Sequence, residues 1–522
     1  MVPASLPSDP LTRTPRIGKA VPYCQESDGA AARRRREPSP SSPSFASGAA
    51  RARPPPTPRR LPPARLPPAP RHEARAGPHD APPRRHARAR ASSPRAAEAV
   101  LRTHDHVFAS RAHSLAAEII LYGPSDIGFA PHGEYWRQAR KLVTTHLLSS
   151  MKVQAFSLAR EEEVGMVMAR IREAAAVGAE VDVGDLLRSF TNDLACRAVM
   201  DKSFRSEGRN RLFRELVAET SPLLAGFNVE ELFPFLARFG VLSKMVRAKS
   251  ERVKRRWDEL LDRLIQDHEH KYDEQHDDTS ASGDTRDDDF IHVLLSVRDE
   301  YGLTRDQMKA LLLDVFFGGI ESLAAVLDFT MAELMRWPRI MKKLQAEVRT
   351  RVPEGQEFVT EADLTDNTPY LIAVIKESLR LHAVTPLLAP HMSMASCSID
   401  GYTIPAGTQA VINTRAIGRD GRFWEDAEEF VPERFVDGGS AAHLNVSGND
   451  FQFLPFGSGR RMCAGINFGM ATVQLMLANL VHCFDWEMPE GEDRRHLDMS
   501  EMFGLVVRRK EKLLLVPKLP RL

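Results

Sequence analysis

Residues 456–465 read FGSGRRMCAG, which places a single cysteine, Cys463, among three glycines and two arginines. A thiolate that binds a metal must stay deprotonated, and fixed positive charge and backbone N–H groups in a glycine-rich loop favour this state. Arg461 is suited to pair with an anionic cofactor group, and Phe456 to cover the sulfur. A lone cysteine is more often a small core residue, so the thiol by itself leaves both interpretations open.

The composition of the 522-residue chain is that of a soluble globular protein. Its formal net charge is +1, so the whole chain gives no electrostatic argument for nucleic acid. The cysteines lack any C-x-x-C pair, which argues against a zinc ribbon, an iron–sulfur cluster or a disulfide framework. A reducing compartment fits best, and any cysteine chemistry rests on one residue.

Two parts of the chain differ in character. Residues 1–90 are mostly Pro, Arg and Ala, a basic composition that cannot bury enough apolar surface to fold, so we expect a disordered segment. A solvated tail is favoured there over an SH3-type, RNA or membrane partner, and nucleic acid binding is disfavoured. Residues 91–522 predict one large domain, whose size suggests an internal cofactor.

Within 91–522 the apolar residues recur mainly with helical periodicity, for instance at 161–176, 210–220 and 244–270. Strand-like alternation is short, as at 401–412, and the acidic run 272–289 predicts a surface loop. Residues 462–484 lack charged side chains and are long enough to cross a bilayer, but their Asn, Gln and His residues favour a buried helix. We expect a mainly α fold with small β-sheets.

A long helix is predicted between Thr304, which forms a capping box with Gln307, and the stop at Trp337-Pro338. Apolar residues cover nearly every face of it, so it should lie in the middle of its domain. Two glycines in its interior, Gly318 and Gly319, favour the close approach of another group.

The acidic residues of this helix allow two interpretations. Glu321 and Ser322 follow the two glycines and form an acid and alcohol pair. Alternatively Asp314, Glu321 and Asp328, spaced by seven, form one wetted stripe. The helix by itself does not choose between them.

The cysteine loop carries the pattern F-x-x-G-x-R-x-C-x-G at five positions, and it resembles the haem-binding loop of the cytochrome P-450 family. The resemblance extends over about 91–522 and is nearest to plant 71-clan (A-type) members. It includes WRQAR from Trp136, GGIESL at 318–323, KESLR with Glu377, and PERF with Arg434.

The resemblance implies a cytochrome P-450 fold and a role for each matching residue. Cys463 is implied as the axial ligand of the iron of haem b, and the cofactor-binding residues are Trp136, Arg140, His391, Phe456, Gly459, Arg461, Cys463 and Gly465. Glu321 and Ser322 are implied as catalytic proton carriers, and Glu377, Arg380 and Arg434 as a buried structural network. Such a cysteinate favours O–O cleavage on the iron.

The function implied is that of a monooxygenase, which inserts one atom of O2 into a small hydrophobic metabolite of terpenoid or phenolic type. Electrons come from NADPH through NADPH-cytochrome reductase, a flavoprotein for which Arg137, Lys141 and Arg460 could form a basic patch. The substrate pocket draws on 119–128, 316–320, 384–388 and 502–505. An O2-independent isomerase or dehydratase, and a non-catalytic or degenerate haem binder, are the alternatives.

Three departures from the family pattern carry expectations of their own. The basic segment replaces the usual membrane anchor, A helix and first strands, so we expect an unpaired sheet edge. The family resides at the endoplasmic reticulum membrane on its cytosolic face, and without an anchor a cytosolic location is the alternative.

His391 stands where the family usually has Arg and is only fractionally charged near neutral pH. Ser322 replaces the usual Thr and lacks the methyl group that restricts χ1.

Overall fold

The computed structural model describes residues 87–200, 209–225, 241–277, 289–353, 355–364 and 368–520. Up to the long central helix the elements are β1 (Arg88–Ala91), α1 (Pro94–Glu98), η1 (Ala99–Thr103), β2 (Ser110–Arg111), α2 (Leu115–Ile120), α3 (Glu134–His146), α4 (Ser150–Ala155), α5 (Ser157–Val177), β3 (Val181–Asp182), α6 (Val183–Met200), α7 (Arg209–Leu224), α9 (Val241–Asp277), α10 (Phe290–Ser296), α11 (Arg298–Tyr301) and α12 (Arg305–Arg336).

After the central helix come α13 (Pro338–Arg351), η4 (Glu361–Leu364), α14 (Pro369–Leu381), β4 (His391–Met392), β5 (Cys397–Ile399), β6 (Tyr402–Ile404), β7 (Gln409–Ile412), α15 (Thr414–Gly418), η5 (Pro432–Phe435), η6 (Gly459–Arg461), α16 (Ile466–Cys483), β8 (Asp485–Glu487), η7 (Arg494–His496), β9 (Glu501–Met502), β10 (Arg508–Arg509) and β11 (Leu514–Lys518). The mainly helical class with small sheets is confirmed.

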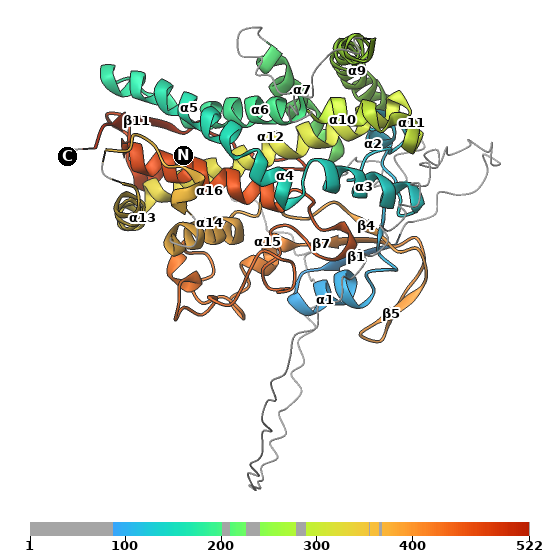
Figure 1. Ribbon diagram of the computed structural model, residues 1–522. Coiled ribbons are helices and arrows are strands. Elements are labelled where there is room, and N and C mark those ends of the chain that lie inside the picture. The colour runs from blue at the N-terminus through green and yellow to red at the C-terminus, as the bar shows by residue number, and fades with distance from the viewer. Residues whose placement is uncertain are drawn as a thin grey trace, which may run out of the picture. The chain divides into compact units, whose positions relative to one another are not determined.

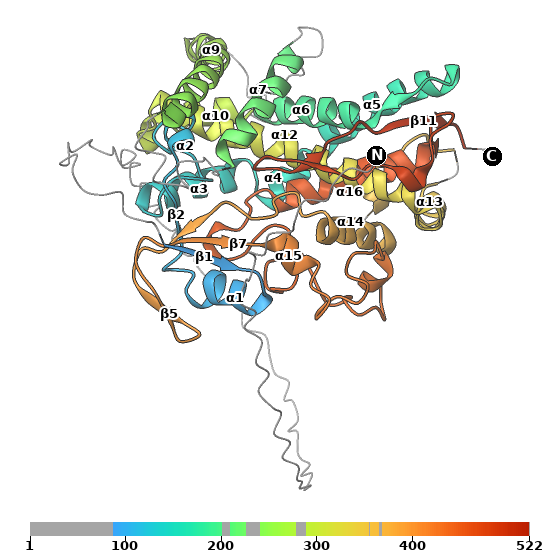
Figure 2. The same cartoon turned by 180° about the vertical axis from the view of Figure 1, so that it is seen from behind.

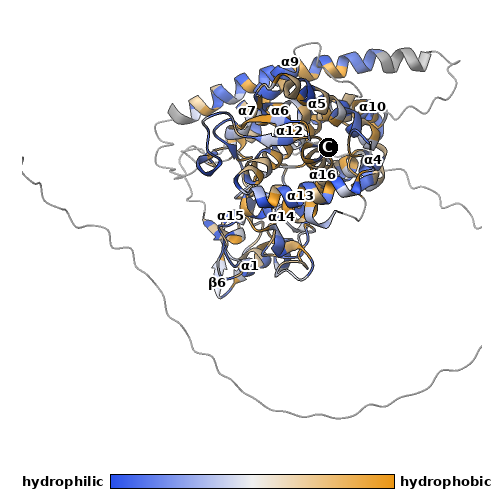
Figure 3. Ribbon diagram, turned by 90° about the vertical axis from the view of Figure 1, so that its left-hand side faces the viewer, coloured by the Kyte–Doolittle hydropathy of each residue, from blue (hydrophilic) through white to orange (hydrophobic). Residues whose placement is uncertain are grey.

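Helix α12 is the centre of the fold. It runs between a layer formed by α5, α6, α7 and α10 and a layer that contains α13, α14 and α16 (Figures 1 and 2). The predicted capping box is present, because Thr304 accepts from the Gln307 N–H while the Gln307 side chain accepts from the Thr304 N–H. Hydrophilic residues gather on outer helices such as α9, as Figure 3 shows.

The apolar core changes partners along α12. Residues from Met308 to Ile320 pack into a cluster with α2, α3, α7 and α9. Residues from Leu323 to Met335 pack into a second cluster with α5, α14 and α16. Only Glu321 and Ser322 lie between these two stretches, so the polar pair marks the boundary where the two halves of the core separate.

The sheets are small. The largest has the order β1-β7-β4-β2, in which β1 pairs in parallel with β7 and the other pairs are antiparallel. Strands β3, β11 and β8 form a three-stranded antiparallel sheet. The predicted strand region 401–412 holds β6 and β7.

Two sequence expectations need correction. Strand β1 begins at Arg88, inside the segment expected to be disordered, and its pairing with β7 shows that a strand does precede α1. The rest of that segment, including any A helix, lies outside the described residues. Helix α9 continues to Asp277, because the first residues of the expected loop 272–289 contain no Gly or Pro to end it. Residues 278–288 lie outside the described residues.

The apolar stretch 462–484 folds as α16, whose residues are mostly buried between α5, α13 and α14. Both α12 and α16 are long and apolar enough to cross a bilayer by length and composition alone. Their place inside the fold supports the prediction that 462–484 forms a buried helix.

Candidate active site

The cysteine loop is shaped by its backbone. The Cys463 N–H donates to the Phe456 carbonyl over 3.0 Å, which closes the loop just before α16. Gly459 has φ of +70°, and a Cβ there would lie 2.5 Å from the carbonyl oxygen of Leu101. Only glycine satisfies both the conformation and the space at this position.

The Cys463 thiol faces an internal cavity of about 880 Å³, a volume that includes its open mouth. Burial raises the pKa of the Cys463 thiol, while the Gly465 N–H and the positive charge of Arg140 lower it. The net pKa lies above the ordinary value, so the thiolate at this position requires a metal ion at Sγ, since a coordinating thiol is deprotonated.

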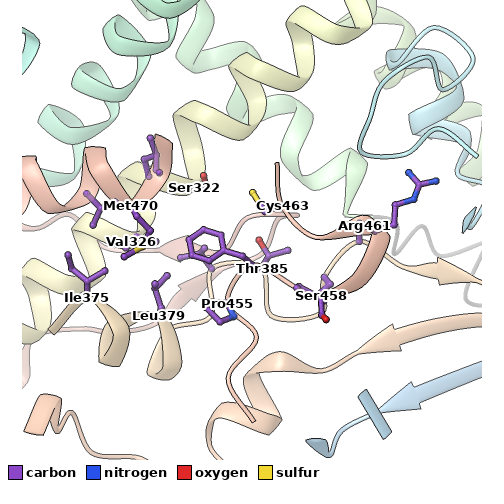
Figure 4. A pocket seen from close by; sticks show the side chains of 18 of the residues that line it. Ser322, Val326, Ile375, Leu379, Thr385, Pro455, Ser458, Arg461, Cys463 and Met470 are labelled. Carbon is purple, nitrogen blue, oxygen red and sulfur yellow. The ribbon is translucent and has the colours of Figure 1, made fainter. Parts of the chain in front are cut away.

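The cavity lies between the loop and α12 (Figure 4). Phe456 and Cys463 line it on the loop side, and Ser322 lines it on the α12 side. Its remaining wall is mostly apolar, with Leu323, Val326, Ile375, Leu379, Val384 and Leu388. The arrangement puts the Cys463 thiol and the Ser322 hydroxyl on opposite sides of a space whose wall is mostly apolar.

Arg461 lines the same cavity, and its guanidinium group is held by backbone carbonyls. It donates to Ala109 O and Ala130 O, each over 2.6 Å, and lies 4.2 Å from the ring centre of Trp136. Arg140 donates to Met462 O over 2.5 Å. Burial and the neighbouring arginines lower the pKa of Arg461 to about 8.

Sequence reasoning missed Arg111, which also lines the cavity. It stands on β2 directly opposite His391 on β4 and donates to Gly128 O over 2.9 Å and Ala389 O over 2.6 Å. Burial lowers its pKa to about 10. The apolar run that ends in Arg111 was visible in the sequence, but its register opposite His391 was not.

His391 differs from the expectation of fractional charge. Its Nδ1 donates to Phe108 O over 2.8 Å, and burial together with Arg111 and Arg461 holds its pKa well below the ordinary value. The imidazole is therefore neutral near neutral pH, with Nε2 as an acceptor. The positive charge at this place comes from Arg111 on the neighbouring strand.

The two polar residues of α12 point in different directions, as neighbours about 100° apart on a helix must. The Ser322 hydroxyl lines the cavity and donates to Gly318 O over 2.5 Å. Glu321 instead faces Ser221 of α7, with Arg508 and Arg188 nearby, and burial raises its pKa to about 7. The structure thus places the hydroxyl at the cavity and the acid behind it.

The wetted-stripe interpretation of α12 is wrong. Glu321 and Asp328 are each only 7% exposed, and Asp328 pairs with Arg509 at 3.5 Å. Asp314 accepts the Ile127 N–H over 2.6 Å. All three acids face protein. Gly318 has no side-chain or backbone atom of another segment within 4 Å of a Cβ position, so open space does adjoin the helix there.

The structure brings Glu377, Arg380 and Arg434 together in the interior. Arg380 donates to both carboxylate oxygens of Glu377, over 2.7 and 2.8 Å, and Arg434 donates to Glu377 Oε1 over 3.1 Å. The other N–H groups of Arg380 donate to the carbonyls of Gly418, Ala427 and Glu429. Every charge in this network has partners, and none of its three residues lines the cavity that Cys463 faces.

Other predicted segments fare unevenly. Val384, Thr385 and Leu388 of the predicted segment 384–388 line the cavity, whereas 119–128, 316–320 and 502–505 contribute none of its lining residues. In the suggested basic patch, Arg460 pairs with Asp105 and Arg137 with Glu134, so part of its charge is neutralised. Trp136 donates its indole N–H to Ile127 O over 2.9 Å and supports the arginines without lining the cavity.

These residues fit a haem group. Within the described part of the chain, Arg111, Arg140 and Arg461 form no ion pair with a carboxylate. Burial and neighbouring arginines lower the pKa of Arg111 and of Arg461, and the charge of Asp126 offsets only part of this. Buried positive charge of this kind calls for an anion, which the propionates of haem supply. The Cys463 sulfur offers the iron ligand, and the apolar wall suits the flat face of a porphyrin.

The comparisons with known proteins agree with this site. The cytochrome P450 family model matches residues 84–516, and the chain belongs to this family. It is a plant-type P450 monooxygenase of specialised metabolism whose cofactor is haem b.

Among its relatives, an indole-2-monooxygenase of maize (Zea mays) is 52% identical over 427 residues, which cover 82% of this chain and 78% of the relative. An indolin-2-one monooxygenase of the same plant is 51% identical over 435 residues, with 82% and 80% covered. A solved zebrafish cytochrome P450 structure with progesterone has a TM-score of 0.67 at 22% identity and covers 82% of this chain and 93% of that chain, which supports the fold.

Proposed function

We propose that this monooxygenase hydroxylates a small, planar, bicyclic aromatic molecule of the indole type. The observation that carries the oxygenase reaction is that the Cys463 thiol, the Ser322 hydroxyl and the side chains of Arg111 and Arg461 all line one cavity. The names of the two maize relatives direct the substrate class, because both act on indole-derived rings. An apolar wall of Leu, Ile and Val side chains suits such a ring and equally suits the terpenoid or phenolic substrates expected from the sequence.

We assign the contacts of the cofactor to residues around the cavity. Cys463 Sγ would ligate the iron, while Arg111, Arg140 and Arg461 would neutralise the propionates, with Trp136 packed against Arg461. When bound, haem with a cysteinate ligand supplies the activation of O2. The wall residues exclude bulk water and orient the substrate.

The chain itself supplies the protons. Ser322 Oγ holds a proton at the cavity wall, and its bond to Gly318 O fixes the hydroxyl rotamer. Glu321, whose pKa of about 7 keeps part of it protonated near neutral pH, resupplies that proton from the other side of α12. Transfer between the two requires ordered water or rotation of a side chain, since they point apart.

Electrons would come from NADPH through a reductase of the cytochrome P450 type. The exposed side chain of Lys141, with Arg137 and Arg460 beside the cysteine loop, is the surface that we assign to an acidic flavoprotein. A place at the cytosolic face of the endoplasmic reticulum membrane agrees with such a partner.

The decisive experiment is the reduced carbon monoxide spectrum of the purified protein supplied with haem. The wild type should show the band at about 450 nm that marks a haem-thiolate, and Cys463→Ala should abolish it. Cys483→Ala is the matched control, because this buried thiol on α16 lies away from the cavity. A band that survives Cys463→Ala would overturn the ligand assignment.

The substrate class needs a second measurement. Turnover of indole and of a sesquiterpene should be compared with NADPH, reductase and O2 present. A hydroxylated indole product that requires O2 supports the proposal, whereas conversion of the sesquiterpene alone contradicts the indole class. A product that forms equally well without O2 would favour an isomerase or dehydratase.

A further inference from the structure

The segment 127–130, which joins α2 to α3, supports the cationic side of the cavity. Its backbone carbonyls accept hydrogen bonds from side chains that the proposed function assigns to the haem. The donors are Trp136 Nε1 and Arg461 Nη1 to Ile127 O over 2.9 and 3.3 Å, Arg111 Nε to Gly128 O over 2.9 Å, and Arg461 Nη2 to Ala130 O over 2.6 Å. The position of this segment therefore sets where both guanidinium groups point.

The N–H side of the same segment is held by two carboxyl groups. The Ile127 N–H donates to Asp314 Oδ2 of α12 over 2.6 Å, and the Phe129 N–H donates to Asp126 Oδ2 over 2.8 Å. A Cβ at Gly128 would lie 3.1 Å from Asp126 Oδ2 and 3.5 Å from Asp314 Oδ1. Both carboxyl groups thus converge on one point of the backbone.

Two ionised carboxylates at this place would repel each other. Asp126 is fully buried, and its Oδ1 has no hydrogen-bond donor from the described residues unless Asp314 carries a proton. Burial and the charge of Asp126 raise the pKa of Asp314 well above its usual range. Burial also raises the pKa of Asp126, but the Phe129 N–H, the charge of Arg461 and the Asp314 side chain offset part of this increase. Asp314 is accordingly the acid of the pair.

Two arginines and one tyrosine face this pair of acids. Arg461 approaches from the cysteine loop and Arg111 from β2, and both favour one negative charge on Asp126. Tyr135 of α3 donates its hydroxyl to Ser125 O over 2.6 Å and stays neutral, because burial and the two acids raise its pKa. One proton and one negative charge match these surroundings.

We propose that Asp126 and Asp314 share a single proton and act as positioning residues, which fasten segment 127–130 to α12 and thereby aim Arg461 and Arg111 at the haem propionates. The inference rests on the proposed function, which assigns these arginines to the cofactor. Loss of the shared proton at high pH would set two negative charges against each other, loosen the segment and speed the release of haem.

The test is the rate of haem transfer from the purified holoenzyme to an excess of apomyoglobin, which does not depend on turnover. Asp126→Asn and Asp314→Asn each keep one negative charge and one permanent donor, so each should release haem within about threefold of the wild-type rate. Asp314→Ala removes the acceptor of the Ile127 N–H and should release haem at least about tenfold faster. Asp328→Asn removes a buried carboxylate elsewhere on α12 and serves as the control.

Raising the pH should accelerate haem release from the wild type but not from Asp126→Asn, which has no shared proton to lose. An equal pH dependence of the two proteins would overturn the proposal. An Asn variant that released haem about tenfold more slowly than the wild type would also overturn the proposal. Such a gain would show that the wild type holds two ionised carboxylates that repel each other. This comparison stands even where Asp314→Ala does not fold.

The two proposals fail separately. A wild type that lacks the haem-thiolate band refutes the proposed function and with it the role of the arginines. A wild type with that band, but with Asp314→Ala releasing haem at the wild-type rate, refutes the positioning role alone.

Discussion

The cysteine loop and the middle of α12 line the same cavity but are specified in different ways. In the loop, the positive φ of Gly459 and the bond of Cys463 N–H to Phe456 O lie within ten residues of chain, and Leu101 limits the space beside Gly459. On α12, Glu321 acquires its role from Ser221, Arg188 and Arg508, which come from three other elements. The geometry of the loop, which its own residues specify, should be the more rigid. The geometry around Glu321 depends on residues of three other elements and should change more readily on mutation.

The largest expected effect comes from the buried network of Glu377, Arg380 and Arg434. Arg380→Leu leaves the buried Glu377 with Arg434 as its remaining cationic partner, so the free energy of unfolding should fall by about 3 kcal/mol. Urea unfolding of the holoenzyme measures this. Arg422→Leu is the matched control, since the Arg422 side chain is 71% exposed and solvent screens its pair with Asp420, so its loss should change the stability little.

Equal losses in the two Arg→Leu variants would show that the interior network contributes no more than a surface pair. Should Arg380→Leu fail to fold, Arg380→Lys keeps the positive charge but loses the two-pronged contact with Glu377. It should still unfold more readily than Arg422→Lys.

A smaller effect is expected within the loop itself. Gly459→Ala sets a methyl group 2.5 Å from Leu101 O and should lower the free energy of unfolding by about 1–3 kcal/mol beyond the strain of positive φ. Gly457→Ala isolates that strain, because Gly457 has φ of +71° but its nearest neighbour, Leu388 Cδ1, lies 3.6 Å away. Thermal unfolding with the haem absorbance as a second probe separates the two variants, and equal destabilisation would contradict the steric argument.

The sequence predicted the local features well and the long-range ones poorly. The capping box at Thr304 and the loop around Cys463 involve residues close in the chain, so their spacing carries the geometry. Arg111 was missed because its place beside His391 at the cavity depends on the register of β2 against β4. The pair formed by Asp126 and Asp314 was missed for a similar reason, since 187 residues separate Ile127 from the acid that binds it.

The direction of Glu321 is the other feature that sequence spacing could not supply. Adjacent letters suggested one acid and alcohol unit, whereas helical geometry sends Ser322 into the cavity and Glu321 toward α7. Residues that are adjacent in sequence lie close together along a helix axis but point to different faces of the helix.

The smallest expected effect concerns Glu321 and is tested through the pH dependence of the reaction. Burial raises the pKa of Glu321 from 4.5 to about 7, so its protonated fraction falls as the pH rises through that value. If Glu321 resupplies Ser322, the yield of product per NADPH consumed should fall by up to about tenfold between about pH 6 and 8, equivalent to about 1.4 kcal/mol. Glu321→Gln should lower that yield and remove its pH dependence, while Asp328→Asn, an acid two turns along α12 that pairs with Arg509, should leave the profile unchanged. A Glu321→Gln enzyme that keeps the wild-type profile would place the acid outside the proton supply and leave Ser322 as the only proton carrier on this side of the cavity among the residues described.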